Sequence, residues 1–449
     1  MVSVKLRNLV AACVAALPLL LGAQEPTPVR VQSYTLTNGL KVHFVEDHSA
    51  QVVAVNVWYD VGSRNERPGR TGFAHLFEHM MFQGSANVGK MEHGQLIERA
   101  GGEFNGTTQP DRTNYYNVVP SNRVNLALWL EADRMRSLAI TPENLANQRE
   151  AVKEERRLRV DNQAYSPAII DSLPMLFSRD RCFAYAHSII GSMADLDAAT
   201  VDDVRAFFAQ HYAPNNAVLV IVGDVNPTAV LPMVQQYFGR IPAGPRREAV
   251  TCESAPGPAR SVVKRITDAN ATLPAVLMAY RTVPPAHADY PALALLTTIL
   301  GEGESSRLNR SLVRGSQVAV AAQTLHDPFG PMRAGGLFAV LAIANASVGV
   351  DALHAALERE TLLAADGITL DELEKARNAW RARTIFGRQT ALDVSEAVQY
   401  AALYLGGPSS VNAEAARYAA VTVSDLRRVA RTYLRAESAL TLLISAEAR

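Results

Sequence analysis

The residues best suited to chemistry lie in the segment 71–82, TGFAHLFEHMMF, which contains His75, Glu78 and His79. The rest of this segment is apolar, so the helix that it predicts is buried. Helical spacing places the two histidines on one face, with Glu78 beside His75. Burying two imidazoles and a carboxylate is costly unless a partner satisfies them. A Zn²⁺ ion held by both imidazoles is such a partner, and H-x-x-E-H is the spacing of a hydrolytic zinc site with Glu as base. The alternative is a pair of core histidines satisfied by hydrogen bonds.

A catalytic zinc ion needs a third protein ligand. Residues 142–160 predict a helix, because Thr141 can cap its start and a proline occupies its first turn. Three acids lie near its end: Glu150, Glu154 and Glu155. Four residues define an apolar stripe along it: Leu145, Ala151, Val152 and Leu158. Helical phase places Glu155 near the middle of this stripe, where a carboxylate needs a partner, whereas Glu150 and Glu154 are interpreted as solvated charges.

At this point the sequence resembles the pitrilysin/insulinase family of inverted-motif zinc peptidases, within the branch of the mitochondrial processing peptidases and their short bacterial relatives. Four stretches carry the resemblance: 71–82, 148–157, 212–224 and 237–242, with a weaker echo at 300–308. The resemblance implies zinc ligands at His75, His79 and Glu155, with Glu78 as the base that activates the zinc-bound water. The family often has a further Glu seven residues before the third ligand, where this chain has Gln148.

The resemblance also implies where a substrate would lie. Residues 101–115 resemble the family's edge strand beside the zinc, to which an extended peptide adds by main-chain pairing. Asn105 and Gly106 match the position that holds the substrate near the scissile bond; the alternative is an ordinary Gly/Thr-rich hairpin. We therefore expect a zinc-dependent endopeptidase acting on peptides or unfolded segments. The alternative is a non-catalytic structural or chaperone-like subunit, although such relatives usually lose the motif that is present here.

A partner chain is expected from what the second half lacks. In the family this half, or that of a partner, often supplies an Arg and, seven residues later, a Tyr that steady the reacting carbonyl. The matching positions here are Val313 and Val320, and Arg314 is one place out of register. We therefore expect a heterodimer with a homologous zinc-free sister chain that carries the Arg/Tyr pair, rather than a homodimer.

The elements that must position these residues form a repeated order. Strand patterns at 34–45, 51–59 and 217–222 alternate with helical patterns at 71–83, 91–100, 121–138, 142–160 and 201–212. After a Pro/Gly/Ser-rich stretch, strand patterns return at 273–280, 338–344 and 439–445, with helical patterns at 290–300, 305–313, 349–365, 370–387 and 423–433. We expect an α+β fold of two homologous domains, each an antiparallel-rich sheet packed with helices, and the family resemblance implies a clam-shell arrangement. The predicted boundaries are 24–241 for the zinc domain, 242–262 for a linker and 263–449 for a second domain without metal ligands.

Composition is that of an ordinary globular protein. The chain has 449 residues, of which 48% are hydrophobic and 20% charged, so disordered and coiled-coil proteins are excluded. Lys and Arg number 44 and Asp and Glu number 44, which argues against a nucleic-acid binder.

The start of the chain predicts its compartment. Residues 1–23 carry Lys5 and Arg7 before a short apolar run that ends in Ala23, the pattern of a secretory signal peptide; the alternative is a membrane anchor. No later segment is long and apolar enough to span a membrane. We expect an exported protein, periplasmic or otherwise extracytoplasmic. There, Cys182 and Cys252 can form a disulfide or stay as two buried thiols.

Overall fold

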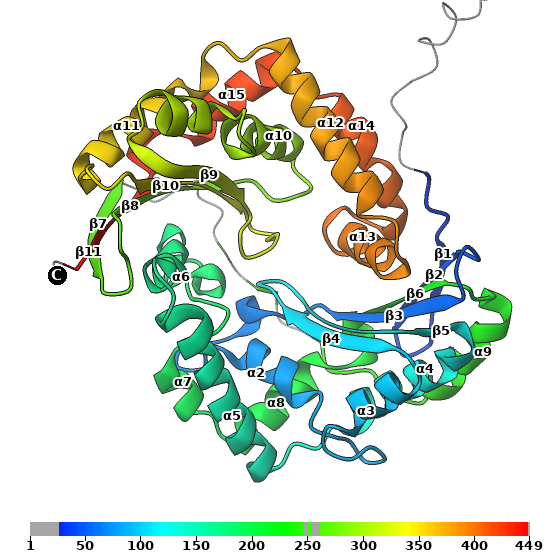
Figure 1. Ribbon diagram of the computed structural model, residues 1–449. Coiled ribbons are helices and arrows are strands. Elements are labelled where there is room, and N and C mark those ends of the chain that lie inside the picture. Colours follow the sequence, from blue (N-terminus) through cyan, green and yellow to red (C-terminus); the bar gives the residue numbers. More distant parts are fainter. Residues whose placement is uncertain (1–26, 247–248, 251, 253–260, 448–449) are drawn as a thin grey trace, which may run out of the picture.

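Two β-sheets face each other across the middle of the molecule, with most helices on their outer sides (Figure 1). The structure, a computed structural model, describes residues 27–246, 249–250, 252 and 261–447. The predicted signal peptide and much of the predicted linker lie outside the described residues. The mixed α+β architecture with two sheets confirms the predicted fold class.

The first sheet has six strands in the order β1-β2-β6-β3-β5-β4. Their bounds are β1 Gln32–Thr35, β2 Lys41–Glu46, β3 Val52–Tyr59, β4 Glu103–Thr108, β5 Thr113–Pro120 and β6 Ala217–Gly223. The pair β2–β6 is parallel and every other pair is antiparallel. Strand β4 is therefore at one edge of the sheet, which is the position that a peptide-pairing strand requires.

The second sheet repeats this plan with five strands in the order β7-β11-β8-β10-β9. Their bounds are β7 Val262–Asp268, β8 Ala275–Thr282, β9 Ala319–His326, β10 Gly336–Ala344 and β11 Leu440–Ala446. Here β7–β11 is the parallel pair, and the remaining pairs are antiparallel. The chain order and the strand directions thus match those of β2, β6, β3, β5 and β4, so the two halves are copies of one unit.

The helices follow the same division. Those of the first half are α2 Phe73–Met80, α3 Glu92–Arg99, α4 Val124–Ser137, α5 Pro142–Arg156, α6 Ser166–Ser172, α7 Met193–Asp197, α8 Val201–His211 and α9 Pro227–Phe238. Those of the second are α10 Tyr290–Gly301, α11 Val350–Leu362, α12 Leu370–Phe386, α13 Ala391–Tyr404, α14 Glu414–Ala419 and α15 Val423–Tyr433. The described residues include two π-helical segments: Arg157–Asp161 directly after α5, and Asn309–Gly315, which overlaps the end of the stretch predicted as a helix at 305–313.

Each half covers the inner face of the other half's sheet. Val398 and Ala401 of α13 pack against Val220 and Val222 of β6. Conversely, the segment 165–186 of the first half packs against the inner residues of β8, β10 and β11. The outer face of each sheet is covered by helices of its own half. This reciprocal covering holds the two halves together around the space between the sheets.

Polar contacts reinforce the packing of α13. Glu396 Oε1 accepts hydrogen bonds from Asn56 Nδ2 at 2.7 Å and from Asn114 Nδ2 at 2.8 Å. Gln399 Nε2 donates to the backbone oxygens of Asn56 and Val218. These contacts lie on the sheet that carries β4 and β5, so the second half helps to fix the strands beside the predicted site.

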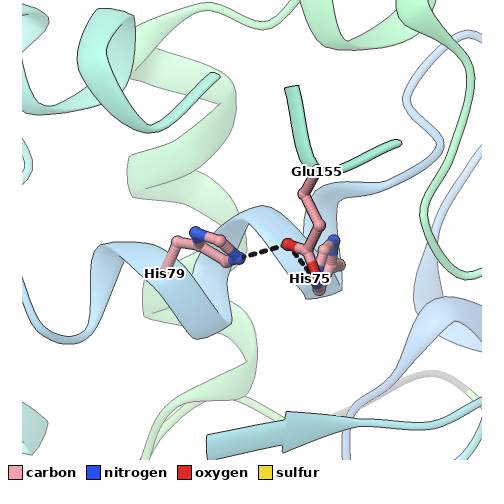
Figure 2. Close-up of side chains that lie close together, drawn as sticks. All are labelled: His75, His79 and Glu155. Atoms are coloured by element: carbon pink, nitrogen blue, oxygen red, sulfur yellow. Dashed lines mark hydrogen bonds and ion pairs between the residues drawn. The ribbon is translucent and has the colours of Figure 1, made fainter. Parts of the chain in front are cut away.

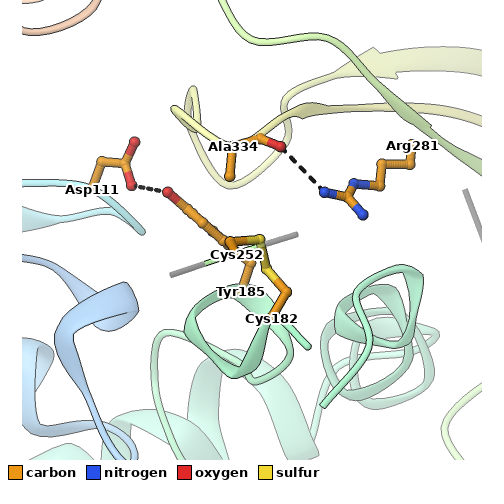
Figure 3. Close-up of a disulfide and its surroundings, with 6 residues drawn as sticks. All are labelled: Asp111, Cys182, Tyr185, Cys252, Arg281 and Ala334. Carbon is orange, nitrogen blue, oxygen red and sulfur yellow. Dashed lines mark hydrogen bonds between the residues drawn. A yellow bond between two sulfur atoms is a disulfide. The ribbon is translucent and has the colours of Figure 1, made fainter. Parts of the chain in front are cut away.

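A disulfide joins Cys182 to Cys252, which settles a pairing that the sequence left open (Figure 3). It ties the inner segment of the first half to a point 70 residues later in the chain. Near it, Tyr185 donates a hydrogen bond to Asp111 Oδ1 at 2.5 Å. In the described part of the chain, no helix combines the length and apolar character needed to cross a bilayer.

Candidate metal centre

Helix α2 is a short buried helix whose start is held by an acidic side chain. Glu66, which is fully buried, accepts hydrogen bonds from the backbone N–H groups of Gly72 and Ala74, both at 2.8 Å. These are first-turn N–H groups that have no partner within the helix. Burial raises the pKa of Glu66 well above its usual range, an effect opposed by the N–H groups that it accepts. The helix is buried as predicted, with Phe77 and Met80 fully enclosed in the first core.

His75 and His79 project from α2 towards Glu155 of α5 (Figure 2). Glu155 Oε2 lies 3.1 Å from His79 Nε2 and 3.5 Å from His75 Nε2. Ligand atoms of all three residues lie within 4.8 Å of one another. Across the described residues, this is the one cluster of three or more His, Cys, Asp or Glu that could hold a metal ion. The structure therefore brings together the three ligands expected from the sequence.

The position of Glu155 on α5 follows the prediction, but the predicted stripe was wrong at two of its four residues. Leu145 and Val152 are buried, whereas Ala151 is exposed and the Leu158 side chain is 56% exposed. Leu158 lies in the π-helical segment, where the wider turn shifts the helical phase. Glu155, three residues after Val152, stays on the buried face and is 18% exposed.

The other two acids near the end of α5 behave as expected for solvated charges. The side chains of Glu150 and Glu154 are 59% and 57% exposed, and each pairs with a basic residue on the helix surface. They contact neither histidine of the cluster. Glu155 is thus the acid of this helix that the fold directs inwards.

The electrostatics of the cluster suit a divalent cation. Burial, together with neighbouring His79, lowers the pKa of His75, so its imidazole is neutral near neutral pH. The hydrogen bond with His79 lowers the pKa of Glu155, which is ionised. His75 Nδ1 is buried without a hydrogen-bond partner among the described residues. Two imidazoles and one carboxylate form a donor set of the type that binds Zn²⁺, so these residues fit the metal.

Glu78 lies beside the cluster and is held by the edge strand. Thr108 Oγ1, at the end of β4, donates a 2.6 Å hydrogen bond to Glu78 Oε2. Burial raises the pKa of Glu78, and the hydrogen bond from Thr108 opposes that rise. A Cβ added at Gly106 would meet Glu78 Cγ at 3.1 Å, so the bare glycine backbone leaves room for this carboxylate. A carboxyl group with a raised pKa is suited to accept and return a proton near neutral pH.

The cluster opens into a cavity of 610 Å³ between the two halves. Asn105 and Gly106 line it together with His75, Glu78 and Glu155. Both predicted substrate-binding residues therefore lie at the cavity, on the edge strand β4. The opposite wall includes Phe329, Met332 and Leu337 of the second half.

The second-half positions considered for an Arg/Tyr pair lie elsewhere. Arg314 pairs with Glu304 at 2.7 Å, and Val320 is 49% exposed. Neither these residues nor Val313 are among the described residues that line the cavity.

Three residues of the site were not singled out from the sequence. They are Glu66 at the start of α2, Thr108 on Glu78, and Arg159, whose Nη1 lies 2.7 Å from Glu155 Oε1. Arg159 follows Glu155 by four residues, a helical spacing that would have flagged an ion pair. Thr108 lies 30 residues from Glu78, and Glu66 lies six and eight residues before the N–H groups that it accepts, so neither contact has a helical or strand spacing that would reveal it.

Comparison with known proteins places this site in a family. Residues 41–181 match the protein-family model for insulinase (peptidase family M16). Residues 198–380 match the protein-family model for the peptidase M16 inactive domain. A zinc protease of Helicobacter pylori, PqqE, is 30% identical over 427 residues, which cover 92% of each chain. A probable mitochondrial-processing peptidase subunit beta of Arabidopsis thaliana is 25% identical and is aligned over 89% of this chain and 75% of its own length.

A solved structure has the same fold. The crystal structure of a protease from Helicobacter pylori superposes with a TM-score of 0.83 at 27% identity, covering 93% of this chain and all of that one. The relatives thus share both halves of the molecule, and the resemblance noted in the sequence is confirmed. The chain belongs to the pitrilysin/insulinase family, peptidase family M16.

Proposed function

We propose that this chain is a zinc-dependent endopeptidase that hydrolyses peptides or unfolded segments. The observation that carries the proposal is the convergence of His75, His79 and Glu155 within 4.8 Å beside Glu78, at a cavity between the halves. In this proposal the two imidazoles and the Glu155 carboxylate hold the zinc ion. When bound, the ion supplies a Lewis acid that polarises a peptide carbonyl and acidifies a water molecule.

Glu78 does the proton transfer in this scheme. Its raised pKa makes it a better base than an exposed carboxylate, and Thr108 fixes one of its oxygens at 2.6 Å. The carboxylate takes a proton from the attacking water and later returns it to the leaving amine. Glu66 keeps α2, and with it both histidines and Glu78, in place through the two hydrogen bonds at the helix start.

The substrate would lie along β4. This strand is at the sheet edge beside α2, so one side of its backbone can pair with an extended peptide. Asn105 and Gly106 would then lie next to the scissile bond. Such pairing requires an extended main chain and little side-chain identity, which favours peptides and unfolded segments over folded proteins.

We further propose an exported enzyme that works with a zinc-free sister chain. The signal-like pattern of residues 1–23 supports export, and the absence of an Arg/Tyr pair at Val313 and Val320 supports a sister chain that provides one. Oxyanion donors contribute about 2.7 to 4 kcal/mol, so the sister should raise activity by about a hundredfold or more. Full activity of the rigorously purified chain, unchanged when the sister is added, would contradict the heterodimer.

The alternative function is a non-catalytic structural or chaperone-like subunit. The match of residues 198–380 to an inactive-domain model supports it, because that match describes a half without catalytic residues. It concerns mostly the second half, whereas His75, Glu78, His79 and Glu155 all belong to the first.

Metal counting combined with one substitution tests the proposal. Purified wild type should contain stoichiometric zinc and cleave a fluorescently labelled unfolded protein. Glu78→Gln should keep the zinc and lose cleavage, and the matched control Glu154→Gln, on the exposed face of α5, should keep both. A chain without zinc, or cleavage that survives Glu78→Gln, would overturn the assignment.

A further inference from the structure

Two arginines that follow Glu155 differ in what they contact. Arg157 pairs with Glu154 at 2.9 Å on the helix surface. Arg159 Nη1 instead lies 2.7 Å from Glu155 Oε1, and Arg159 lines the cavity. Arg159 belongs to the π-helical segment Arg157–Asp161, and π-helical turns are frequent at functional sites.

Arg159 is the one Arg or Lys among the described residues that line the cavity. Its side chain is 77% exposed, although Glu155 is only 18% exposed. A guanidinium has five N–H donors in a planar fork, and the ion pair with Glu155 uses one end of that fork. The remaining N–H donors of this largely exposed group are therefore accessible at the cavity.

The two acids that line the cavity cannot both neutralise the charge of Arg159 and balance a metal ion at the cluster. Glu155 Oε2 faces both histidines, so this carboxylate is shared between the cluster and Arg159. Glu78, the other acid of the lining, is held by Thr108. With a divalent cation on the cluster, the two carboxylates balance the metal, and the guanidinium is a net positive charge in the cavity.

The surroundings of Arg159 restrict what it could bind. Val160, Phe177, Phe329 and Met332 line the same cavity and are apolar. A ligand that matches the cavity therefore has a carboxylate to pair with Arg159 and apolar side chains to contact the apolar lining. The carboxylate can come from an Asp or Glu side chain of the peptide or from its C-terminus.

We infer that Arg159 is a specificity-determining residue that binds a carboxylate of the peptide near the scissile bond. This inference rests on the peptidase function proposed above. It names a substrate class, peptides with an acidic group next to apolar residues, that the metal cluster alone does not select.

The test uses one neutral apolar peptide scaffold in matched versions. A single Glu is moved along the scaffold, each Glu peptide is paired with its Gln counterpart, and a further pair differs only in a free or amidated C-terminus. Cleavage by wild type, Arg159→Gln, Arg159→Glu and the control Arg157→Gln is measured as kcat/KM. Binding of the same peptides to Glu78→Gln and to the Glu78→Gln/Arg159→Gln double variant is measured by fluorescence anisotropy, and zinc content is counted for every variant.

Wild type should prefer a Glu peptide over its Gln counterpart by about tenfold or more at one position, or the free over the amidated C-terminus by a similar factor. The first result identifies a side-chain carboxylate and the second a terminal one. Arg159→Gln should abolish the preference in both cleavage and binding with zinc retained, Arg159→Glu should reverse it, and Arg157→Gln should leave it unchanged.

Three results would overturn the inference: no carboxylate preference in wild type, a preference that survives Arg159→Gln, or loss of zinc with an equal loss on all peptides. The last result would show that Arg159 only supports Glu155. A failure of the peptidase proposal is distinguishable, because no peptide would then be cleaved by wild type while the binding measurement would still report on Arg159.

Discussion

The two halves of this chain have the same sheet plan and differ most at one helix. In the first half α2 lies in the chain between β3 and β4, and in the second half α10 lies between the matching strands β8 and β9. Helix α2 carries His75, Glu78 and His79, whereas α10, YPALALLTTILG, carries no ionisable side chain except Tyr290. The same place in the fold thus holds the candidate metal ligands in one copy and an apolar core helix in the other.

The two helices therefore contribute differently: α10 contributes to stability, and α2 also carries the residues suited to chemistry. Eleven of the twelve residues of α10 are buried, so the helix serves packing alone. Helix α2 places two imidazoles and a carboxylate next to a cavity, where each needs a partner. We therefore expect substitutions in the second half to change the free energy of unfolding, and those near α2 to change zinc binding or catalysis as well.

The largest expected effect concerns the disulfide that supports the reciprocal covering of the halves. Opening a loop of 70 residues by Cys182→Ser with Cys252→Ser should lower the free energy of unfolding by about 4 kcal/mol. Urea unfolding of wild type and of the double variant, each with and without reductant, measures it. Reductant should destabilise wild type alone; a wild type that is insensitive to reductant would contradict the pairing.

The next effect compares the two matching helices directly. Leu296 of α10 and Leu76 of α2 are both fully buried, so replacing either by Ala should cost about 3 kcal/mol of stability. Leu296→Ala should leave the zinc content of the folded protein unchanged, whereas Leu76→Ala should also weaken zinc binding because it loosens the helix that carries the histidines. Equal zinc affinity in the two variants would contradict the claim that α2, and not α10, positions the metal ligands.

A third effect compares two buried aspartates in the hairpin loops of the two sheets. Asp111 lies 3.4 Å from the Arg64 guanidinium, whereas Asp327 accepts hydrogen bonds from Tyr290 and from the Leu337 N–H. Burial raises the pKa of Asp327 to about 7. Between about pH 4 and pH 7 the unfolded carboxylate is ionised while the folded one keeps its proton, so stability falls as pH rises.

Asp327→Asn should therefore flatten the dependence of stability on pH in this window and raise stability at pH 8 by roughly 2 kcal/mol. Burial raises the pKa of Asp111 as well, but Asp111→Asn should lower stability at pH 8, because it leaves the buried Arg64 with one carboxylate fewer. Thermal unfolding between pH 4 and pH 8 tests both variants. A stability gain from Asp111→Asn would show that the two loops do not differ in this way.

The smallest effect concerns threonines of the matching edge strands. Thr108 donates to Glu78 and opposes the rise of its pKa, so Thr108→Val should raise that pKa further. The acid limb of the kcat/KM profile should then move to higher pH, with about tenfold lower activity at the acid end. Thr324 of β9 donates to the Thr297 backbone oxygen, and Thr324→Val should leave the pH profile unchanged. An unmoved acid limb in Thr108→Val would contradict the role given to Thr108.

Much of the site could be predicted from sequence because its signals are local. The i, i+4 histidines and the intervening Glu78 lie within a single helix, so their shared face follows from helical geometry. Glu155 was predicted from its phase relative to a stripe of Leu145, Ala151, Val152 and Leu158 and from the family resemblance. The stripe was wrong at Leu158 because α5 passes into a π-helical segment, which no periodicity of 3.6 residues describes.

Two of the elements that were missed, α13 and β9, have weak local patterns. Helix α13 has buried polar residues, Ser395 and Gln399, because it covers the sheet of the other half, and such a helix looks solvent-exposed from its sequence. Strand β9, AVAAQTLH, is rich in alanine, which has low strand propensity. The disulfide and the contact of Thr108 with Glu78 depend on tertiary proximity, which a single sequence does not contain.

The most direct test of the central claim is anomalous diffraction at the zinc edge from crystals of the purified chain grown with zinc. The account predicts a peak enclosed by His75, His79 and Glu155 in the first half and none beside α10 in the second. A map without a peak at these three residues, or with its peak on another set of side chains, would contradict it.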